Sequence, residues 1–231
     1  MKIAMFGHKR IPSREGGVEI VVEELASRMV KTGNKVTCFN RNGKGCVSQK
    51  YGKRYNFNGI EVKTVPTIDK KGMAAVTAAF FSSVMAAFGK YDIVHIHAEG
   101  PAFFSWIPKL FHKKIVVTVH GLDWQREKWK GGFGAKFIRK GEENAVKYAD
   151  EIIVLSKNVE QYFKTRYNRI TRFIPNGVNR PTIRKADRIQ SVYGLEKNGY
   201  ILFLGRLVPE KGIMYLRSEE RRVGKECPYR C

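Results

Sequence analysis

Residues 93–97 (IVHIH) and 115–120 (IVVTVH) are two short runs rich in valine and isoleucine. Runs of this kind are typical of strands that are buried on both faces of a parallel sheet. Five further segments share the pattern: Lys2–Phe6, Lys35–Asn40, Ile60–Val65, Glu151–Leu155 and Tyr200–Leu204. The sequence therefore predicts an α/β fold with a mainly parallel sheet.

Helical patterns lie between these runs. Apolar residues recur at helical spacing from Val18 to Met29, and further helices are expected over 131–149 and 184–193. The segment Asn56-Phe57-Asn58-Gly59 predicts a hairpin turn. Right-handed connections between the strands then predict a doubly wound sheet.

Residues 175–181 (PNGVNRP) interrupt this alternation with two prolines, a glycine and two asparagines. We therefore expect one complete α/β domain over 1–175, a linker over 176–199 and the start of a second domain over 200–216. From Arg217 onward no apolar stripe continues. We interpret 217–231 as a non-native tail, because it resembles translated sequencing-adapter DNA, and exclude it from fold reasoning.

The 231-residue chain has 43 Lys and Arg against 21 Asp and Glu, a net charge of +22. Such a charge favours an acidic partner: nucleic acid, anionic lipid or a phosphorylated substrate. Nucleic acid is not expected, because no long basic block and no interleaving of aromatic with basic residues is present. The four cysteines form no C-x-x-C pair, and the first residues read as a strand, so we expect a cytoplasmic protein.

Residues 73–88 (MAAVTAAFFSSVMAAF) contain no charge and are flanked by lysines. The run is shorter than the roughly 20 residues that span a bilayer. It therefore predicts a buried helix or one lying on a surface, with insertion at a membrane interface as the alternative.

Two glycine-containing turns suit an anion. In LGRLVPEKG (204–212), Gly205 allows close backbone approach, and Arg206 and Lys211 place two cations at the open end of a strand. Gly16 and Gly17 open a helix after the first strand, where backbone N–H groups attract anions. G-x-G-x-x-G and Walker A signatures are absent from the sequence, which argues against a dinucleotide dehydrogenase.

Histidines mark two strand ends. His120, in VHGLDW, lies where ligands of α/β sheets bind, and Asp123 and Trp124 offer hydrogen bonding and stacking to an acceptor. In VHIHAEG, His95 and His97 share one strand face. With Glu99 they would make a metal site, but we expect no metal: one histidine bonded within the sheet and the other at the rim of a cleft, beside Glu99.

Six motifs, in order, carry a resemblance to a known family: GGVE, YDIVHIH, VHGLDW, ADEIIVLS, IPNGV and LGRLVPEKG. Over about 1–216 the chain resembles family-4 retaining glycosyltransferases of the GT-B fold. HGLDWQREKW together with IPNGVNRP is similar to the bacterial branch that builds capsular and other surface polysaccharides, including rhamnosyltransferase-like enzymes.

The resemblance implies two facing Rossmann-like domains, with the acceptor side over 1–175 and a nucleotide-sugar domain starting at 200. It implies that Arg206 and Lys211, with Gly16 and Gly17 nearby, bind the donor diphosphate. His120 contacts the donor sugar, and the acceptor-binding candidates are Asp123, Trp124, His97 and Glu99. No cofactor or metal is expected, because catalysis would stabilise the departing diphosphate electrostatically.

The expected partners are a nucleotide-sugar donor, a lipid-linked or glycan acceptor and an anionic membrane surface, at which the protein would be peripheral. The family's paired glutamates are missing, so we expect a truncated second domain and little or no transferase activity from the chain as written. Two alternatives stay open: a basic nucleic-acid-binding protein, and a GT-B relative that is not a transferase, such as a sugar epimerase.

Overall fold

The computed structural model describes residues 1–43, 52–70, 72–125, 132–183, 185, 187–205, 207 and 212–216. The chain divides into two units, Met1–Gly177 and Val178–Cys231. Unit 1 contains the sheet and both buried cores, whereas the described part of unit 2 contains helix α7 (Asp187–Tyr193), one helical turn at 213–216 and irregular backbone.

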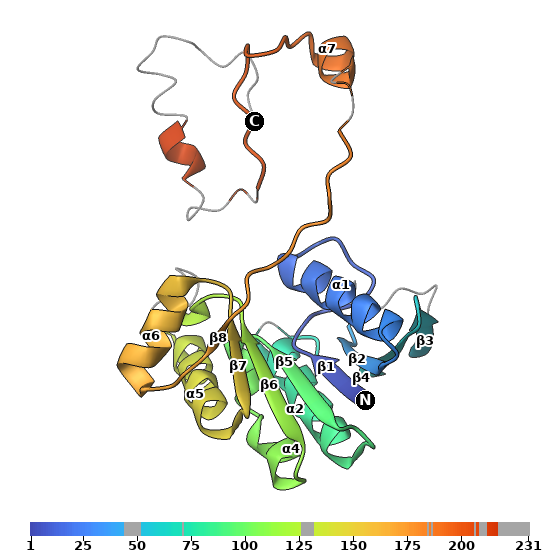
Figure 1. The fold of residues 1–231 in the computed structure, drawn as a ribbon, viewed down its shortest axis with the longest axis vertical. Helices are drawn as coiled ribbons and strands as arrows, with labels where there is room; N and C mark the ends of the chain where they lie inside the picture. Colours follow the sequence, from blue (N-terminus) through green and yellow to red (C-terminus); the bar gives the residue numbers. More distant parts are fainter. Residues whose placement is uncertain are drawn as a thin grey trace. The chain divides into compact units, whose positions relative to one another are not determined.

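The described residues of unit 1 form an eight-stranded sheet in the order β3-β4-β2-β1-β5-β6-β7-β8 (Figure 1). The strands are β1 (Lys2–Phe6), β2 (Lys35–Arg41), β3 (Arg54–Phe57), β4 (Ile60–Val65), β5 (Ile93–His97), β6 (Lys114–Val119), β7 (Glu151–Val154) and β8 (Arg172–Phe173). Every pair is parallel except β3 with β4. The chain moves outward from β1 first through β2 and later through β5, so the order reverses there, as at ligand-binding crevices of open α/β sheets.

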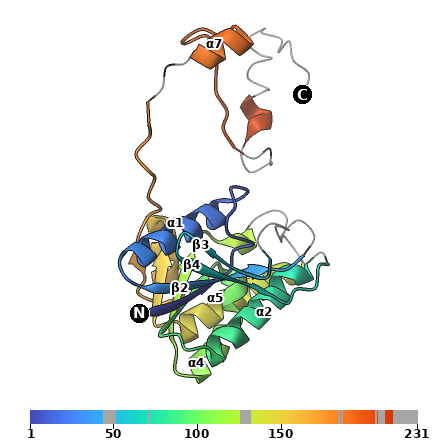
Figure 2. The ribbon, with the colours of Figure 1, turned by 90° about the vertical axis from the view of Figure 1, so that its right-hand side faces the viewer.

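Helices cover the sheet on both faces (Figure 2). Those of unit 1 are α1 (Gly17–Lys31), α2 (Met73–Phe88), α3 (Glu99–Ala102), α4 (Trp106–Leu110), α5 (Phe133–Tyr148) and α6 (Lys157–Tyr167), with a 3₁₀ turn, η1 (Asp123–Gln125). Side chains of a strand alternate between its faces. Ile3 and Met5 of β1 therefore join the core under α1, while Ala4 and Phe6 join the core on the α2 side.

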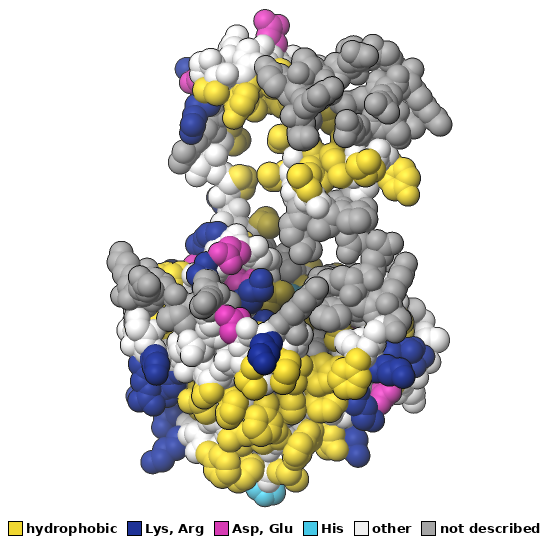
Figure 3. Space-filling model, turned by 180° about the vertical axis from the view of Figure 1, so that it is seen from behind, with side chains coloured by type: hydrophobic (Ala, Val, Ile, Leu, Met, Phe, Trp, Pro, Cys, Tyr) yellow, Lys and Arg dark blue, Asp and Glu magenta, His cyan; other side chains and the backbone are white. Residues whose placement is uncertain are grey.

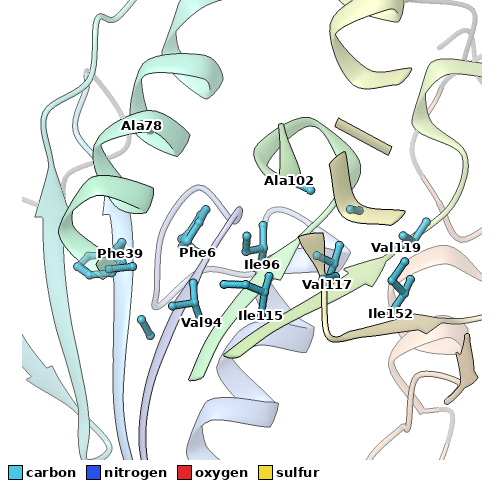
Figure 4. Close-up of a cluster of buried hydrophobic side chains, with 14 of the residues drawn as sticks. Phe6, Phe39, Ala78, Val94, Ile96, Ala102, Ile115, Val117, Val119 and Ile152 are labelled. Atoms are coloured by element: carbon cyan, nitrogen blue, oxygen red, sulfur yellow. The ribbon is translucent and has the colours of Figure 1, made fainter. Parts of the chain in front are cut away.

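The larger core lies along the middle of the sheet (Figure 4). Val94 and Ile96 of β5 meet Ile115 and Val117 of β6 there, and all four are fully buried. Burial on both faces explains why the central strands read as Val/Ile-rich runs, and it confirms the predicted parallel α/β architecture.

The predicted hairpin is present between β3 and β4. Asn58 and Gly59 both have positive φ, 51° and 82°, which is the backbone of a type I′ turn. Asn56 Oδ1 accepts a hydrogen bond from Gly59 N at 2.9 Å and closes the turn.

Three helices and two strands were not named from the sequence: α3, α4, α6, β3 and β8. Of the β3–β4 hairpin, the turn and strand 60–65 were predicted. Helix α6 carries clear end signals, because Ser156 accepts a hydrogen bond from Val159 N and Asn168 ends the helix in the left-handed conformation. The predicted strand over 200–204 is wrong, because this segment is irregular backbone. A strand needs a partner for its backbone hydrogen bonds, and the described part of unit 2 contains no other strand.

Gly141 sets the distance between α5 and α3. A Cβ at this position would lie 2.0 Å from the backbone oxygen of Glu99, far inside van der Waals contact. The two helices therefore pack this closely only because residue 141 lacks a side chain.

Replacing Gly141 with alanine is expected to lower the free energy of unfolding by about 2 kcal/mol, because the new methyl group must push α5 away from α3. Gly17→Ala is the matched control: it is also helical, its Cβ would meet no atom within 4 Å, and alanine should raise stability by up to about 1 kcal/mol. Urea unfolding of both variants measures the difference, and equal stabilities would show that the close approach does not need glycine.

Candidate active site at the carboxyl ends of the strands

Three histidines come together where β1, β5 and β6 end. His8 follows β1, His97 ends β5 and His120 follows β6. The parallel register pairs Phe6 with Ile96 and His97 with Thr118, so these strand ends lie at one edge of the sheet. The edge is the place at which α/β sheets bind ligands.

The rings of His95, His97 and His120 form a stack. Ring centroids lie 4.3 Å apart for the first pair and 5.4 Å for the second. His95 Nε2 bonds Thr118 Oγ1 at 2.8 Å, and His97 Nδ1 bonds His120 Nε2 at 3.1 Å. His95 is thus bonded inside the sheet, and His97 fixes the orientation of the half-buried His120 ring at the rim.

His8 lies near His97, at the end of β1. Its Nε2 donates to Asn40 Oδ1 at 3.0 Å, and the same oxygen accepts from Ile11 N at 3.0 Å. Gly7, just before it, has φ 114°, and a Cβ there would lie 2.0 Å from the His97 carbonyl oxygen. Glycine is therefore needed for the ends of β1 and β5 to approach each other.

Burial keeps these imidazoles neutral. Desolvation lowers the pKa of His8 and of His95 from 6.5 to about 4. The pKa of His97 is held well below 6.5, first by burial and then by repulsion from His95, His120 and His8. Near neutral pH this edge of the sheet therefore offers hydrogen-bonding groups without added positive charge from these three histidines.

Two buried carboxyl groups, Glu99 and Glu142, lie beside the stack. Glu142 accepts hydrogen bonds from Trp124 Nε1 at 3.0 Å, Tyr162 OH at 2.8 Å and Tyr167 OH at 2.5 Å. Burial, and next the neighbouring Glu142, raise the pKa of Glu99 from 4.5 to about 9. Glu99 is therefore protonated at neutral pH, beside a Glu142 carboxyl group that accepts hydrogen bonds from three donors.

The loop after β6 is attached to this pair. Glu99 Oε2 accepts a hydrogen bond from Asp123 N at 2.9 Å, and Glu142 holds the indole N–H of Trp124. The guanidinium of Arg139 lies 4.6 Å from the Trp124 ring centroid. Glu99 and His97 are fully buried, and their hydrogen bonds position the loop. Asp123 and Trp124 are partly exposed. Acceptor binding by these four residues stays a prediction.

The predicted Gly16-Gly17 turn lies at the start of α1, with Gly16 as the N-cap. Glu19, in the first turn, is buried and accepts a hydrogen bond from Lys9 N at 3.0 Å. Arg14 pairs with the buried Glu23 at 3.0 Å, and Arg10 pairs with Glu15. The loop between β1 and α1 is therefore held by ion pairs and leads into a helix start of the kind that attracts anions.

Arg206 and Lys211, the predicted diphosphate ligands, lie outside the described residues. Within the described part of the chain, no three His, Cys, Asp or Glu side chains gather in a way that could hold a metal ion. A hollow beneath the start of α2 reaches Gly7, His8 and Arg41, but its volume of about 10 Å³ has room for no more than a water molecule.

Sequence reasoning missed His8, Glu142, Tyr162 and Tyr167. The reasoning that identified His120 could also have identified His8, because His8 likewise follows the end of a buried strand. The other three lie on α5 and α6, far along the chain from Glu99 and Trp124, and no local pattern indicates that they meet.

Unit 1 carries histidines, a carboxyl pair and a helix that starts with glycine at one edge of a mainly parallel sheet. An α/β protein with such an edge belongs to the class that binds ligands there. The comparisons with known proteins specify the class further. Residues 15–180 match the family described as Glycosyltransferase Family 4, and the chain belongs to this family.

Individual relatives agree with that membership. The chain is 25% identical over 233 residues to an uncharacterised glycosyltransferase of Methanocaldococcus jannaschii, covering 94% of this chain and 58% of the relative. Sucrose-phosphate synthase of Thermosynechococcus elongatus superposes with a TM-score of 0.74 at 18% identity, over 96% of this chain and 60% of that one. HepE of Anabaena, in complex with UDP and glucose, gives a TM-score of 0.52 at 16% identity, over 78% and 45%.

These structures confirm the predicted GT-B-type α/β fold. The chain spans about 60% of the length of the first two relatives.

The free energy of unfolding is expected to be highest near pH 6.5. Between pH 6.5 and about 4, the unfolded chain takes up protons on histidines that stay neutral when folded. His8 and His95 therefore each lower stability by about 1.4 kcal/mol for each unit by which the pH falls, and His97 acts in the same direction. Glu99 acts in the opposite direction, because the folded state holds its proton up to about pH 9 while the unfolded state releases it near 4.5. Above pH 6.5 only the effect of Glu99 remains among these four, and stability falls as the pH rises.

Urea unfolding from pH 5 to 9 measures both limbs. Glu99→Gln should flatten the alkaline limb, because glutamine keeps the hydrogen bond to Asp123 N without titrating. His95→Asn should make the acid limb shallower by about 1.4 kcal/mol per pH unit. Unchanged limbs in both variants would show that these groups are not held neutral.

Proposed function

We propose that the protein is a glycosyltransferase that moves a sugar from a nucleoside-diphosphate sugar to a hydroxyl group of an acceptor, with retention of configuration. Family membership over residues 15–180 carries the proposal. The histidine stack supports it, because it fixes the ring of His120 at the strand edge at which a donor sugar would lie. The HepE structure, in complex with UDP and glucose, is consistent with a nucleotide-sugar donor.

In the proposed reaction the bond between the anomeric carbon and the diphosphate oxygen breaks, and the diphosphate keeps the electron pair. Arg206 and Lys211 stabilise the charge that develops on it, and backbone N–H groups at Gly16 and Gly17 contribute from the start of α1. The acceptor oxygen attacks the same face of the carbon and gives up its proton to the oxygen of the departing diphosphate. These roles require no metal or cofactor.

The histidine stack would serve this chemistry by position and by charge. His97 holds the ring of His120, so that it meets a sugar hydroxyl in a fixed orientation. Because burial keeps His95 and His97 neutral, these two rings add no fixed cation that would hold the diphosphate after transfer. The loop that carries Asp123 and Trp124 follows His120 and is hydrogen-bonded to the carboxyl pair. We propose that this loop binds the acceptor.

For the acceptor we propose a lipid-linked or growing surface glycan at the inner face of the plasma membrane, where the protein would be peripheral. The net charge of +22 favours attraction to anionic lipid. No helix among the described residues has the length and apolar character needed to cross a bilayer. The sucrose-phosphate synthase likeness is one of fold, and the choice of acceptor therefore rests on the sequence resemblance and the charge.

The first test is transfer by the intact protein of labelled sugar from UDP-, GDP- and dTDP-sugars to a membrane lipid extract. His120→Ala is expected to lower kcat about 100-fold or more, because a group that contacts the reacting sugar is lost. Lys147→Ala, exposed near the opposite edge of the sheet, should leave kcat unchanged. NMR of the product tests retention. Conversion of the donor without an acceptor would favour an epimerase, and salt-steep DNA binding without sugar-nucleotide binding would favour a nucleic-acid-binding protein.

Arg206→Ala and Lys211→Ala test the diphosphate role separately. Each is expected to weaken binding of a nucleoside diphosphate about ten- to a hundredfold, because a charge-assisted hydrogen bond is lost. Isothermal titration with UDP and GDP measures the effect. Unchanged affinity in both variants would exclude these two residues from the donor site.

A further inference from the structure

Helix α2 has small residues on its buried side and large apolar residues on its exposed side, unlike a typical helix that faces water. Its sheet-facing side consists of small residues: Ala78, Ala79, Ser82, Ser83, Ala86 and Ala87. Three of its large residues, Met73, Phe80 and Phe88, are exposed, Phe88 to 72%, whereas Phe81 and Met85 are partly buried against the core. Surface helices normally carry charged or polar residues on this side, whereas α2 has no charged residue in 16 positions.

Helix α4 and the residue after it extend the same surface. Trp106, Leu110 and Phe111 are exposed, Leu110 to 67%. The rings of Phe88 and Phe111 lie 4.6 Å apart, and those of Phe80 and Phe104 lie 5.5 Å apart, so the two helices present one continuous surface. We call it the α2–α4 face and define it by Met73, Phe80, Phe88, Trp106, Leu110 and Phe111. Figure 3 shows this side of unit 1 as a broad apolar region.

Basic residues border the face. Lys70 precedes α2 and Lys90 follows it, and both are exposed. Lys113 donates to Gly89 O at 2.8 Å, which places it beside the end of α2. Lys109 and Lys114 flank Asp150, at 2.8 and 3.7 Å, so two cations face one carboxylate there. Figure 3 shows Lys and Arg side chains on both flanks of the apolar region.

We propose that the α2–α4 face docks on an anionic lipid bilayer, with its aromatic and aliphatic side chains entering the interface and the lysines meeting lipid phosphates. An exposed apolar surface with a basic border and interfacial aromatic residues has the chemistry of a helix that lies in a membrane interface. At 16 residues, α2 is too short to span the bilayer, so it lies on it.

A second copy of the chain fits this face less well. In a two-fold pair the same surface meets itself, so the lysine border of one copy would face the lysine border of the other. Like charges opposed across an interface cost binding free energy, whereas anionic lipid neutralises them. The charge pattern therefore favours the bilayer.

The test is co-sedimentation of the 231-residue chain with vesicles, without donor or acceptor. Vesicles of phosphatidylglycerol and phosphatidylcholine (1:1) should bind the chain at least about tenfold more tightly than phosphatidylcholine alone, and added NaCl should weaken binding. Phe88→Ser and Leu110→Ser should each weaken binding about tenfold or more, because one large side chain no longer enters the interface. Ile170→Ser, at a side chain that is 88% exposed on the loop between α6 and β8, is the matched control and should bind as the parent does.

Circular dichroism shows that each variant is folded, and brominated lipids report the depth of insertion. They should quench the fluorescence of Trp106, and Trp106→Phe should lose most of that quenching. Absence of vesicle binding, or equal binding by all variants, would overturn the proposal. A dimer in sedimentation velocity that Phe88→Ser dissociates would instead assign the face to a second copy. That the acceptor lies at the membrane rests on the proposed function, whereas vesicle binding can be measured without donor or acceptor. A failure of sugar transfer can therefore be distinguished from a failure of membrane docking.

Discussion

The neutrality of the buried polar groups at the carboxyl edge of the sheet is the constraint on which the site depends. His97 and Glu99 have no exposed surface, so a charge on either would be desolvated without full compensation. The structure avoids this by keeping the histidines unprotonated and Glu99 protonated. Glu99 then holds the backbone of Asp123, and His97 holds the ring of His120, so the loop after β6 takes its position from these two buried groups.

Close backbone approach is the second requirement of this arrangement. Gly7 lets the end of β1 reach His97, and Gly141 lets α5 reach Glu99. Any side chain at either position would separate the elements that carry the polar groups, and the hydrogen bonds between them would lengthen. The fold and the site therefore depend on the same few contacts.

The sequence allowed most strands of unit 1 to be predicted, because a strand that is buried on both faces is a run of apolar residues. The edge strands β3 and β8 lack such a run and were not predicted. The meeting of His97 and His120 follows from the same pattern, since neighbouring parallel strands end at one edge. Glu142 and Tyr162 could not be predicted in this way, because their contacts depend on how α5 and α6 pack on the sheet. The strand expected at 200–204 was wrong for a related reason: its local pattern suits a strand, but a strand exists only where a neighbour pairs with it.

The unusual composition of α2 links the fold to the proposed membrane surface. Alanine and serine on its inner side let the helix lie close to the sheet. Phe81 and Met85 pack against the core from the flank of the helix, whereas Met73, Phe80 and Phe88 are exposed. The first turns of α2 also border the hollow that reaches Gly7 and His8, next to the histidine stack. A bilayer bound along α2 would therefore lie near the edge of the sheet that carries His120. An acceptor tethered to lipid would then reach the site without leaving the membrane surface, so one helix would serve both packing and access to substrate.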